Sequence, residues 1–176
     1  MTGACRVRAL EGLGLREIEG LSDVLIDCVD GGASVSFMHP MTREKAVRFW
    51  RSNAESVARG ERVVVIAEDD DVIVGTVTVI LSVPENQPHR ADVAKMLVHR
   101  RARNRGVGAA LLTAAERTAL DAGKWLLVLD TVTDSPASRL YVRHGWQRCG
   151  EIPNYALWPD GRLCPTTVYY KELRSG

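Results

Sequence analysis

Apolar residues recur at helical spacing in two stretches near the start of the chain. The first stretch covers residues 15–28, where an apolar side chain returns every three or four positions before a glycine pair. The second follows Thr42, a residue type that caps helix starts, and ends at Gly60. A weaker alternation of polar and apolar residues over 5–10 comes before both. The pattern predicts one short strand and then two helices.

Runs of β-branched residues predict the strands that follow. The runs "RVVVIAE" and "VIVGTVTVILS" lie on either side of the acidic turn 69–71, which is typical of an antiparallel hairpin. Shorter apolar runs predict four more strands, at residues 91–98, 126–131, 146–152 and 166–173.

Two further helices separate these strands. A helical face of small and aliphatic residues runs from Gly106 until Gly123 stops it. A short helix begins at Asp134 or Ser135, either of which can act as the N-cap, and ends at Gly145. Strands and helices in this order predict a mixed α/β domain, with a largely antiparallel sheet and a β-α-β crossover in its middle.

The length and composition of the chain fit one globular domain. With 176 residues the chain can build one substantial core but not two, so we expect a single domain over residues 1–176. Hydrophobic residues make up 45% of the chain and charged residues 26%, and the formal net charge is +1. Because this balance carries no general attraction for polyanions, we expect neither a nucleic acid nor a membrane as a partner.

Cysteine spacing and the first residues bear on metals and on location. The cysteines are scattered without a Cys-x-x-Cys pair and the histidines lack ligand spacing, so we expect no metal and no disulfide framework. The start of the chain lacks the apolar core of a signal peptide, and no stretch approaches the roughly 20 apolar residues of a membrane helix. These observations favour a cytoplasmic protein.

The stretch "RRARNRGVGAALL", residues 100–112, places a Gly-x-Gly at a predicted strand-to-helix junction. Glycines let a backbone approach an anion closely, and the first amides of a helix favour a phosphate. On this pattern alone, a phosphate site and a plain loop are both open. A Walker loop would need a lysine after Gly108, and a Rossmann turn would need a glycine in place of Leu111. Nucleotide hydrolysis and dinucleotide binding are therefore not indicated.

Two motifs resemble the signatures of the GNAT N-acetyltransferase superfamily. Arg103, Gly106 and Gly108 match its Arg/Gln-x-x-Gly-x-Gly/Ala turn, directly after an apolar strand. The segment "DSPASRLYVRHGW" is similar to its second signature, Asn-x-x-Ala-x-x-Leu-Tyr-x-x-x-Gly-Phe, with Asp134 in place of the asparagine. The resemblance implies an α/β GNAT fold, with a mixed, mostly antiparallel central sheet of about seven strands and four helices. It also implies that strands 4 and 5 are parallel and splayed.

The resemblance implies acetyl-CoA as the cosubstrate. The apolar strand would hold its pantetheine arm through backbone groups, and the glycine turn would wrap its pyrophosphate mainly through amides. The expected coenzyme contacts come from this strand, this turn and the short helix, and they are Met96, Leu97, Val98, Arg103, Asn104, Arg105, Gly106, Val107, Gly108, Ala109, Asp134, Ser138 and Arg143.

Acetyl transfer to an amine needs a neutral nucleophile and a proton for the departing thiolate. Tyr141 stands where members of the family carry a tyrosine that donates this proton, and a core aromatic on a helix face is the alternative. Asp130 ends a predicted strand and is the candidate base that the resemblance implies, with a helix or loop cap as the alternative. Asp92, Glu68 or a chain of waters are the other candidates for the base.

The segment that links the first two helices forms one wall of the acceptor site in the family. Ser34, Phe37 and Trp50 are therefore candidate substrate contacts, with Asp92 as a fourth, and a structural loop is the alternative. Segments such as "GGASVSFM" and "HRADVAKMLV" look like parts of tabtoxin resistance acetyltransferases.

These resemblances predict an acetyl-CoA-dependent N-acetyltransferase that acts by direct transfer. We expect the acceptor to be a small-molecule amine, such as a toxin or an antibiotic, and the protein to be a monomer or a homodimer. A protein or peptide N-acetyltransferase and a non-catalytic acyl-CoA-binding module are the alternatives.

Overall fold

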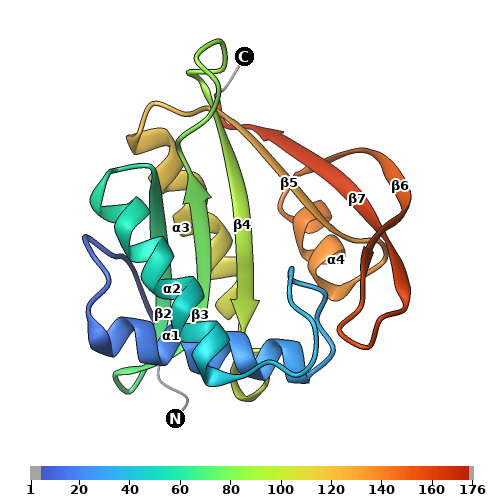
Figure 1. Ribbon diagram of the computed structural model, residues 1–176. Coiled ribbons are helices and arrows are strands. Elements are labelled where there is room, and N and C mark those ends of the chain that lie inside the picture. Colours follow the sequence, from blue (N-terminus) through green and yellow to red (C-terminus); the bar gives the residue numbers. More distant parts are fainter. Residues whose placement is uncertain (1–4, 175–176) are drawn as a thin grey trace.

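A seven-stranded sheet forms the centre of the computed structural model, which describes residues 5–174. The expected single domain also includes residues 1–4 and 175–176, which lie outside the described residues. The strands lie in the order β1-β2-β3-β4-β5-β7-β6 (Figure 1). They are β1 (Arg6–Ala9), β2 (Arg62–Asp69), β3 (Val72–Ile80), β4 (Arg90–Val98), β5 (Leu126–Val132), β6 (Gln147–Leu157) and β7 (Leu163–Glu172). The β4–β5 pair is parallel and the other neighbouring pairs are antiparallel.

Four α-helices surround the sheet. In Figure 1, α1 (Leu15–Asp30) and α2 (Arg43–Ala58) lie in front of the β2–β4 part of the sheet, and α3 (Val107–Asp121) lies behind it. The short helix α4 (Pro136–Arg143) lies beside β5. The mixed sheet and these helices confirm the predicted fold class. Within residues 5–174, no helix has the length and apolar character needed to cross a membrane.

Side-chain caps and a glycine set the starts of three helices. Thr42 caps α2 with its side chain, as predicted. Ser135 rather than Asp134 caps α4, since Ser135 Oγ accepts a hydrogen bond from Ser138 N at 3.1 Å. The N-cap of α3 is Gly106, which has no side chain and has a φ of 78°. The amides in the first turn of α3 therefore have no side-chain cap and no partner within the helix.

β2 is buried on both faces, which explains its unbroken apolar run. Val65 and Ala67 join the core beneath α3, whereas Val64 and Ile66 join the core beneath α1 and α2. Trp50 of α2 belongs to this second core. The sheet thus separates two apolar layers and fixes the helices on each side of it.

β4 and β5 separate after a short paired segment. Their Cα partners run only from Arg90 and Leu126 to Asp92 and Val128, while β5 stays paired with β7 along its whole length. In Figure 1, β4 continues straight while β5 turns away from it together with β7. The expected splay is therefore present, and it opens the sheet toward the carboxyl end of β4.

β4 also carries a bulge opposite β3. Thr76 pairs with Leu97 and Thr78 pairs with Ala94, so two residues of β4 lie opposite one residue of β3. One of these two is Lys95, whose φ is 51°. A bulge bends a strand and re-aims its side chains, and this one lies where β4 has already left β5.

Two details differ from the prediction made from sequence. A 3-10 turn, η1 (Arg100–Ala102), lies in the arginine-rich segment where the sequence predicts only a loop. β6 and β7 extend farther toward each other than predicted. β6 is an edge strand that is exposed along most of its length, so it has no apolar run from which its end could be predicted.

Candidate active site

A cavity of about 1320 Å³ occupies the region where β4 and β5 separate. We call it the central pocket. It is lined by both strands, by the turn before α3, by α4, by the loop over residues 31–38 and by the β6–β7 pair. Segments from most of the chain therefore meet at the splay (Figure 1).

The start of α3 has the geometry of an anion-binding turn. Gly106 adopts a left-handed conformation that favours glycine. A Cβ at Gly108 would lie 3.2 Å from Leu140 Cδ2, so the side chain of α4 that packs on this turn leaves only a tight fit for a larger residue. The open amides and the positive end of the helix dipole favour a phosphate. The turn can therefore accept a phosphate group through its backbone.

Two arginines beside this turn are engaged with the protein itself. Arg103 lines the pocket, but its Nε donates to Val98 O at 3.0 Å. Arg105 pairs with Asp69 at 2.8 Å and does not line the pocket. Backbone amides are therefore the main anion-binding groups that the turn offers.

Asp130 lies near the end of β5 and exposes its carboxylate to the central pocket. Thr166 of β7, which is 3% exposed, places its Oγ1 hydroxyl 2.8 Å from Asp130 Oδ2, to which it can donate a hydrogen bond, and 2.9 Å from Thr131 O, its alternative acceptor. One carboxylate oxygen is thus held by the protein. The carboxylate can accept a proton or bind a cation in the pocket.

Tyr141 lies on α4, lines the central pocket and is 4% exposed. Its ring packs near Trp146 and Tyr169, with centroid distances of 5.7 and 6.0 Å. Burial raises the pKa of Tyr141 above its ordinary value, and the negative charge of Asp130 raises it further. The phenol therefore stays protonated at neutral pH and can donate a hydrogen bond.

Most of the residues predicted to contact a coenzyme line the central pocket. Arg105 and Ser138 do not, because Arg105 pairs with Asp69 and Ser138 donates its hydroxyl to Ser135 O at 2.8 Å. The predicted residues that do line the pocket are Met96, Leu97, Val98, Arg103, Asn104, Gly106, Val107, Gly108, Ala109, Asp134 and Arg143.

The predicted acceptor contacts divide into two pairs. Ser34 and Phe37 line the central pocket, and Ser34 Oγ donates to a backbone carbonyl of β6 at 2.7 Å. Trp50 is 0% exposed and lies in the core beneath α1 and α2. Asp92 forms an ion pair with Arg90 and does not line the pocket. The structure therefore brings Ser34 and Phe37 to the site but places Trp50 and Asp92 outside it.

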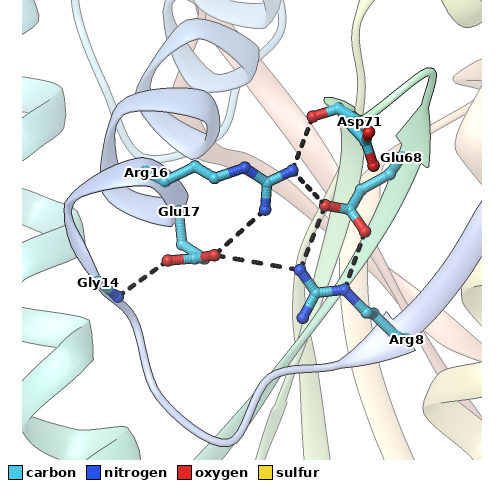
Figure 2. A network of polar contacts seen from close by, with 6 residues as sticks. All are labelled: Arg8, Gly14, Arg16, Glu17, Glu68 and Asp71. Carbon is cyan, nitrogen blue, oxygen red and sulfur yellow. Dashed lines mark hydrogen bonds and ion pairs between the residues drawn. The ribbon is translucent and has the colours of Figure 1, made fainter.

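Glu68, another candidate for the base, belongs to an ion-pair network away from the central pocket. Figure 2 shows its carboxylate between Arg8 and Arg16, each of which places a nitrogen 2.8 Å from a Glu68 oxygen. The hydrogen bonds from these arginines lower the pKa of Glu68 to about 2. The network supports a structural role for Glu68. Of the three candidate carboxylates, only Asp130 lines the pocket.

Lys95 and Thr166 line the central pocket but are not predicted from the sequence. Lys95 interrupts an apolar strand, and this interruption is the signal that identifies it in retrospect. Thr166 belongs to a β-branched run that is typical of any strand, so its sequence context does not mark it as the partner of Asp130.

Residues 60–148, just over half of the chain, match a family model described as an acetyltransferase (GNAT) domain. The matched segment runs from the residues before β2 into β6. It therefore contains both splayed strands, the turn before α3, Asp130 and Tyr141.

Solved structures share the fold over nearly the whole chain. A ribosomal-protein-alanine N-acetyltransferase from Brucella melitensis is 19% identical, with a TM-score of 0.78, over 96% of this chain and 99% of that chain. A candidate acetyltransferase from Salmonella typhimurium, solved with its cofactor acetyl-CoA, is 16% identical, with a TM-score of 0.78, over 99% and 96%. A candidate phosphinothricin N-acetyltransferase is 20% identical, with a TM-score of 0.78, over 98% and 100%. At these identities the likeness shows the common fold.

Proposed function

The chain belongs to the GNAT acetyltransferase domain family, and on that premise we propose that it transfers an acetyl group from acetyl-CoA directly to the amine of a small molecule. One observation carries the proposal: the central pocket joins an anion-binding turn, a held carboxylate and a protonated phenol. Acetyl-CoA has a pyrophosphate in its middle and a thiol leaving group at its end. These three groups therefore match what the transfer requires.

The residues present fit acetyl-CoA. When bound, it supplies an acetyl group activated as a thioester. The amides of residues 106–109 would hold the pyrophosphate, since this turn has no side-chain cap. Beyond Asp92, the edge of β4 that faces β5 has no strand partner within residues 5–174. Val98 O at the end of β4 accepts from Arg103 Nε, and the unpaired N–H and C=O groups before it are open to an extended ligand arm.

Asp130 is the proposed proton acceptor. Thr166 holds one oxygen of the carboxylate, which leaves the other oxygen to meet an amine proton directly or through a water molecule. An ionised carboxylate also attracts the cationic form of the amine, which must lose a proton before it can attack.

Tyr141 is the proposed proton donor to the departing thiolate. A free thiol is a stronger acid than a free phenol, with ordinary pKa values of about 8.5 and about 10, and burial of Tyr141 widens this gap. The phenol therefore assists mainly by a hydrogen bond to the sulfur, which strengthens as negative charge develops there.

The acceptor side of the central pocket favours a small molecule. Ser34 donates to β6 at 2.7 Å, and His39 N donates to Pro159 O at 3.1 Å, so the loop 31–38 is fastened to β6 in its middle and to the β6–β7 turn directly after its end. Because the loop 31–38 is held in place, this side of the central pocket fits an enclosed site for a small molecule better than an open groove for a polypeptide. An acceptor of the toxin or antibiotic kind, as in the tabtoxin resistance acetyltransferases, is consistent with this arrangement.

Thiol release from acetyl-CoA over a panel of amines tests the proposal. We expect at least one small amine to accelerate release by the parent protein, and Asp130→Asn and Tyr141→Phe to reduce the rate without weakening coenzyme binding. Tight coenzyme binding with no acceleration by any amine would instead support a non-catalytic acyl-CoA-binding module. Turnover of peptides alone would support a protein or peptide N-acetyltransferase.

We also propose that the protein is a single domain that works in the cytoplasm as a monomer or a homodimer. We expect no metal requirement. Within residues 5–174, no three or more His, Cys, Asp or Glu side chains are arranged so that they could hold a metal ion. Light scattering measures the oligomeric state, and assays with and without a chelator check the metal.

A further inference from the structure

The charged residues that line the central pocket fall into two groups. Arg103, Asp134 and Arg143 belong to the turn before α3 and to α4 with the residues that precede it, which is the side proposed for the coenzyme. Lys95 and Asp130 belong to the two splayed strands. β4 and β5 thus each contribute one charge to the pocket, and the two charges have opposite sign.

The ammonium group of Lys95 is poorly compensated by the protein. Lys95 is half-buried and donates a hydrogen bond to Ser36 Oγ at 3.0 Å. The centroid of the Phe49 ring lies 5.8 Å from its Nζ. Within the part of the chain that is described, no carboxylate forms an ion pair with Lys95, although Asp130 is close enough to attract it. Since an ammonium carries three N–H donors, Lys95 keeps donors for a ligand.

The contact between Lys95 and Ser36 is built from two unusual backbone conformations. Their φ angles are 51° and 76°, in the left-handed region that residues with a Cβ seldom adopt. The bulge in β4 directs Lys95, and the fastened loop 31–38 holds Ser36. Such conformations gather at ligand-binding sites, where the surrounding structure maintains them. Two of them meeting at one pocket wall point to a binding role for this contact.

The electrostatics of the pocket favour an anion at the same place. Burial lowers the pKa of Lys95, and the negative charge of Asp130 opposes this effect. A negative group bound at Nζ would offset the cost of burying the ammonium. The pocket therefore has a place for a negative group beside β4 and a place for a positive group beside β5.

We propose that the acceptor is a zwitterion, in which an acidic group, in its simplest form a carboxylate, accompanies the reacting amine. Lys95 and Ser36 bind the acidic group, and the amine lies toward Asp130. The inference rests on the proposed function, because it concerns the acceptor side of the same pocket. α-Amino acids and their analogues have this chemistry. Polyamines and aminoglycosides, which carry amines without an acidic group, lack it.

Matched acceptors test the inference. The standard amino acids are compared with their α-carboxamides, which keep the amine and the side chain but lose the negative charge. Thiol release gives KM, and calorimetry in the presence of CoA gives Kd. We expect the best acids to have KM and Kd values lower than those of their amides by about tenfold or more. Equal or better binding of the amides would overturn the inference.

The ionisation of the amine cannot produce the expected preference in assays at pH 7, where the amines of the acids and of their amides are both mostly cationic. An α-amino amide is less basic than the corresponding amino acid, so a larger fraction of its amine is neutral and ready to attack. A protein that recognises only the neutral amine would therefore favour the amides.

Variants of Lys95 identify the group that recognises the acid. We expect Lys95→Met to raise KM and Kd for the acids by about tenfold or more, with little change for the amides, and Lys95→Arg to keep part of the preference. Lys124→Met is the matched control, because Lys124 is also half-buried, donates to Pro88 O at 2.8 Å and lies outside the central pocket. An equal change for acids and amides in a folded Lys95→Met protein would contradict the inference.

The binding measurement separates this inference from the proposed function. Acid-selective binding without thiol release would defeat the proposed function alone. Turnover of amines without any preference for acids would defeat the inference alone. Acetylation of Lys95 itself, detected by peptide mass, would also overturn the inference, because an acetylated lysine carries no charge to bind an acid.

Discussion

Thr166 Oγ1 lies 2.8 Å from Asp130 Oδ2 and 2.9 Å from Thr131 O, so one buried hydroxyl reaches both a side chain and the backbone near the end of β5. A hydroxyl has one proton, so it donates to one of these acceptors at a time. The contact orients the Asp130 carboxylate while leaving it exposed to the central pocket. β7 thereby positions the candidate base.

Replacement of Thr166 tests this positioning role. Thr166→Val removes the hydroxyl with little change of shape, and we expect kcat to fall about tenfold because the carboxylate loses its orientation. The KM for acetyl-CoA should change little, since the turn before α3 is untouched. Thr166→Ser keeps the hydroxyl and should restore kcat. Thiol-release kinetics measure both variants, and an equal loss in the serine variant would argue against positioning.

Tyr141→Phe tests the candidate acid. The raised pKa keeps the phenol protonated throughout the neutral range, so its loss removes a hydrogen bond to the sulfur at every pH assayed. We expect kcat to fall about a hundredfold, with the Kd for CoA nearly unchanged. Calorimetry and thiol release measure the two quantities. A variant with full kcat would leave Tyr141 as a core aromatic.

Gly108→Ala tests the close approach of α4 to the start of α3. The added Cβ would lie 3.2 Å from Leu140 Cδ2, so the Leu140 side chain or the start of α3 must give by a few tenths of an ångström, which disturbs the anion-binding turn. We expect the KM for acetyl-CoA to rise about tenfold. Gly150→Ala is the control, because a Cβ there has no atom within 4 Å and its φ is not positive. Equal KM values for the two variants would show that the turn tolerates a side chain.

Glu68→Gln tests the network in Figure 2 as a source of stability. Hydrogen bonds from Arg8 and Arg16 hold the pKa of Glu68 at about 2, against an ordinary value of 4.5. We expect the variant to lose on the order of 2 kcal/mol of unfolding free energy at neutral pH. This loss is smaller than the full difference in pKa would give, because both arginines are partly exposed and solvent weakens the ion pairs. Urea denaturation measures the loss.

The stabilisation that Glu68 provides should depend on pH. The unfolded chain binds a proton at Glu68 near pH 4.5, whereas the folded protein does so only near pH 2. The stabilisation is therefore complete above the higher pKa and is lost as the pH falls through the lower one. The difference between parent and variant should shrink over this range. Glu61→Gln, which breaks an exposed pair with Arg59, serves as the control and should change little at any pH.

Features that depend on local chemistry are predicted well from the sequence. Thr42 and Ser135 cap helices because their hydroxyls accept backbone hydrogen bonds wherever a helix starts. Gly106 is identified from the Gly-x-Gly at a strand-to-helix junction, and the structure shows that its left-handed N-cap conformation is one that favours glycine. The hairpin of β2 and β3 follows from two β-branched runs around an acidic turn. None of these features needs information from distant parts of the chain.

Features that depend on tertiary contacts are not predicted. Helical spacing places Trp50 on the apolar face of α2. Only the packing of α2 against the sheet decides that this side chain faces a core rather than the central pocket. The sequence makes Asp92 a candidate base, but in the structure its carboxylate forms an ion pair with Arg90. The bulge at Lys95 arises from the register between β3 and β4, which neither strand shows alone.

Ser34 and Leu157 share a hydrogen bond although 123 residues separate them in the chain. Two segments that lie far apart in the chain therefore have to agree in shape to form this wall of the pocket. The shape of the proposed acceptor site therefore depends jointly on residues 31–38 and on the end of β6. A chimaera that takes one segment from a relative and keeps the other will carry mismatched halves. A redesign of the proposed acceptor site therefore requires that both segments be exchanged together.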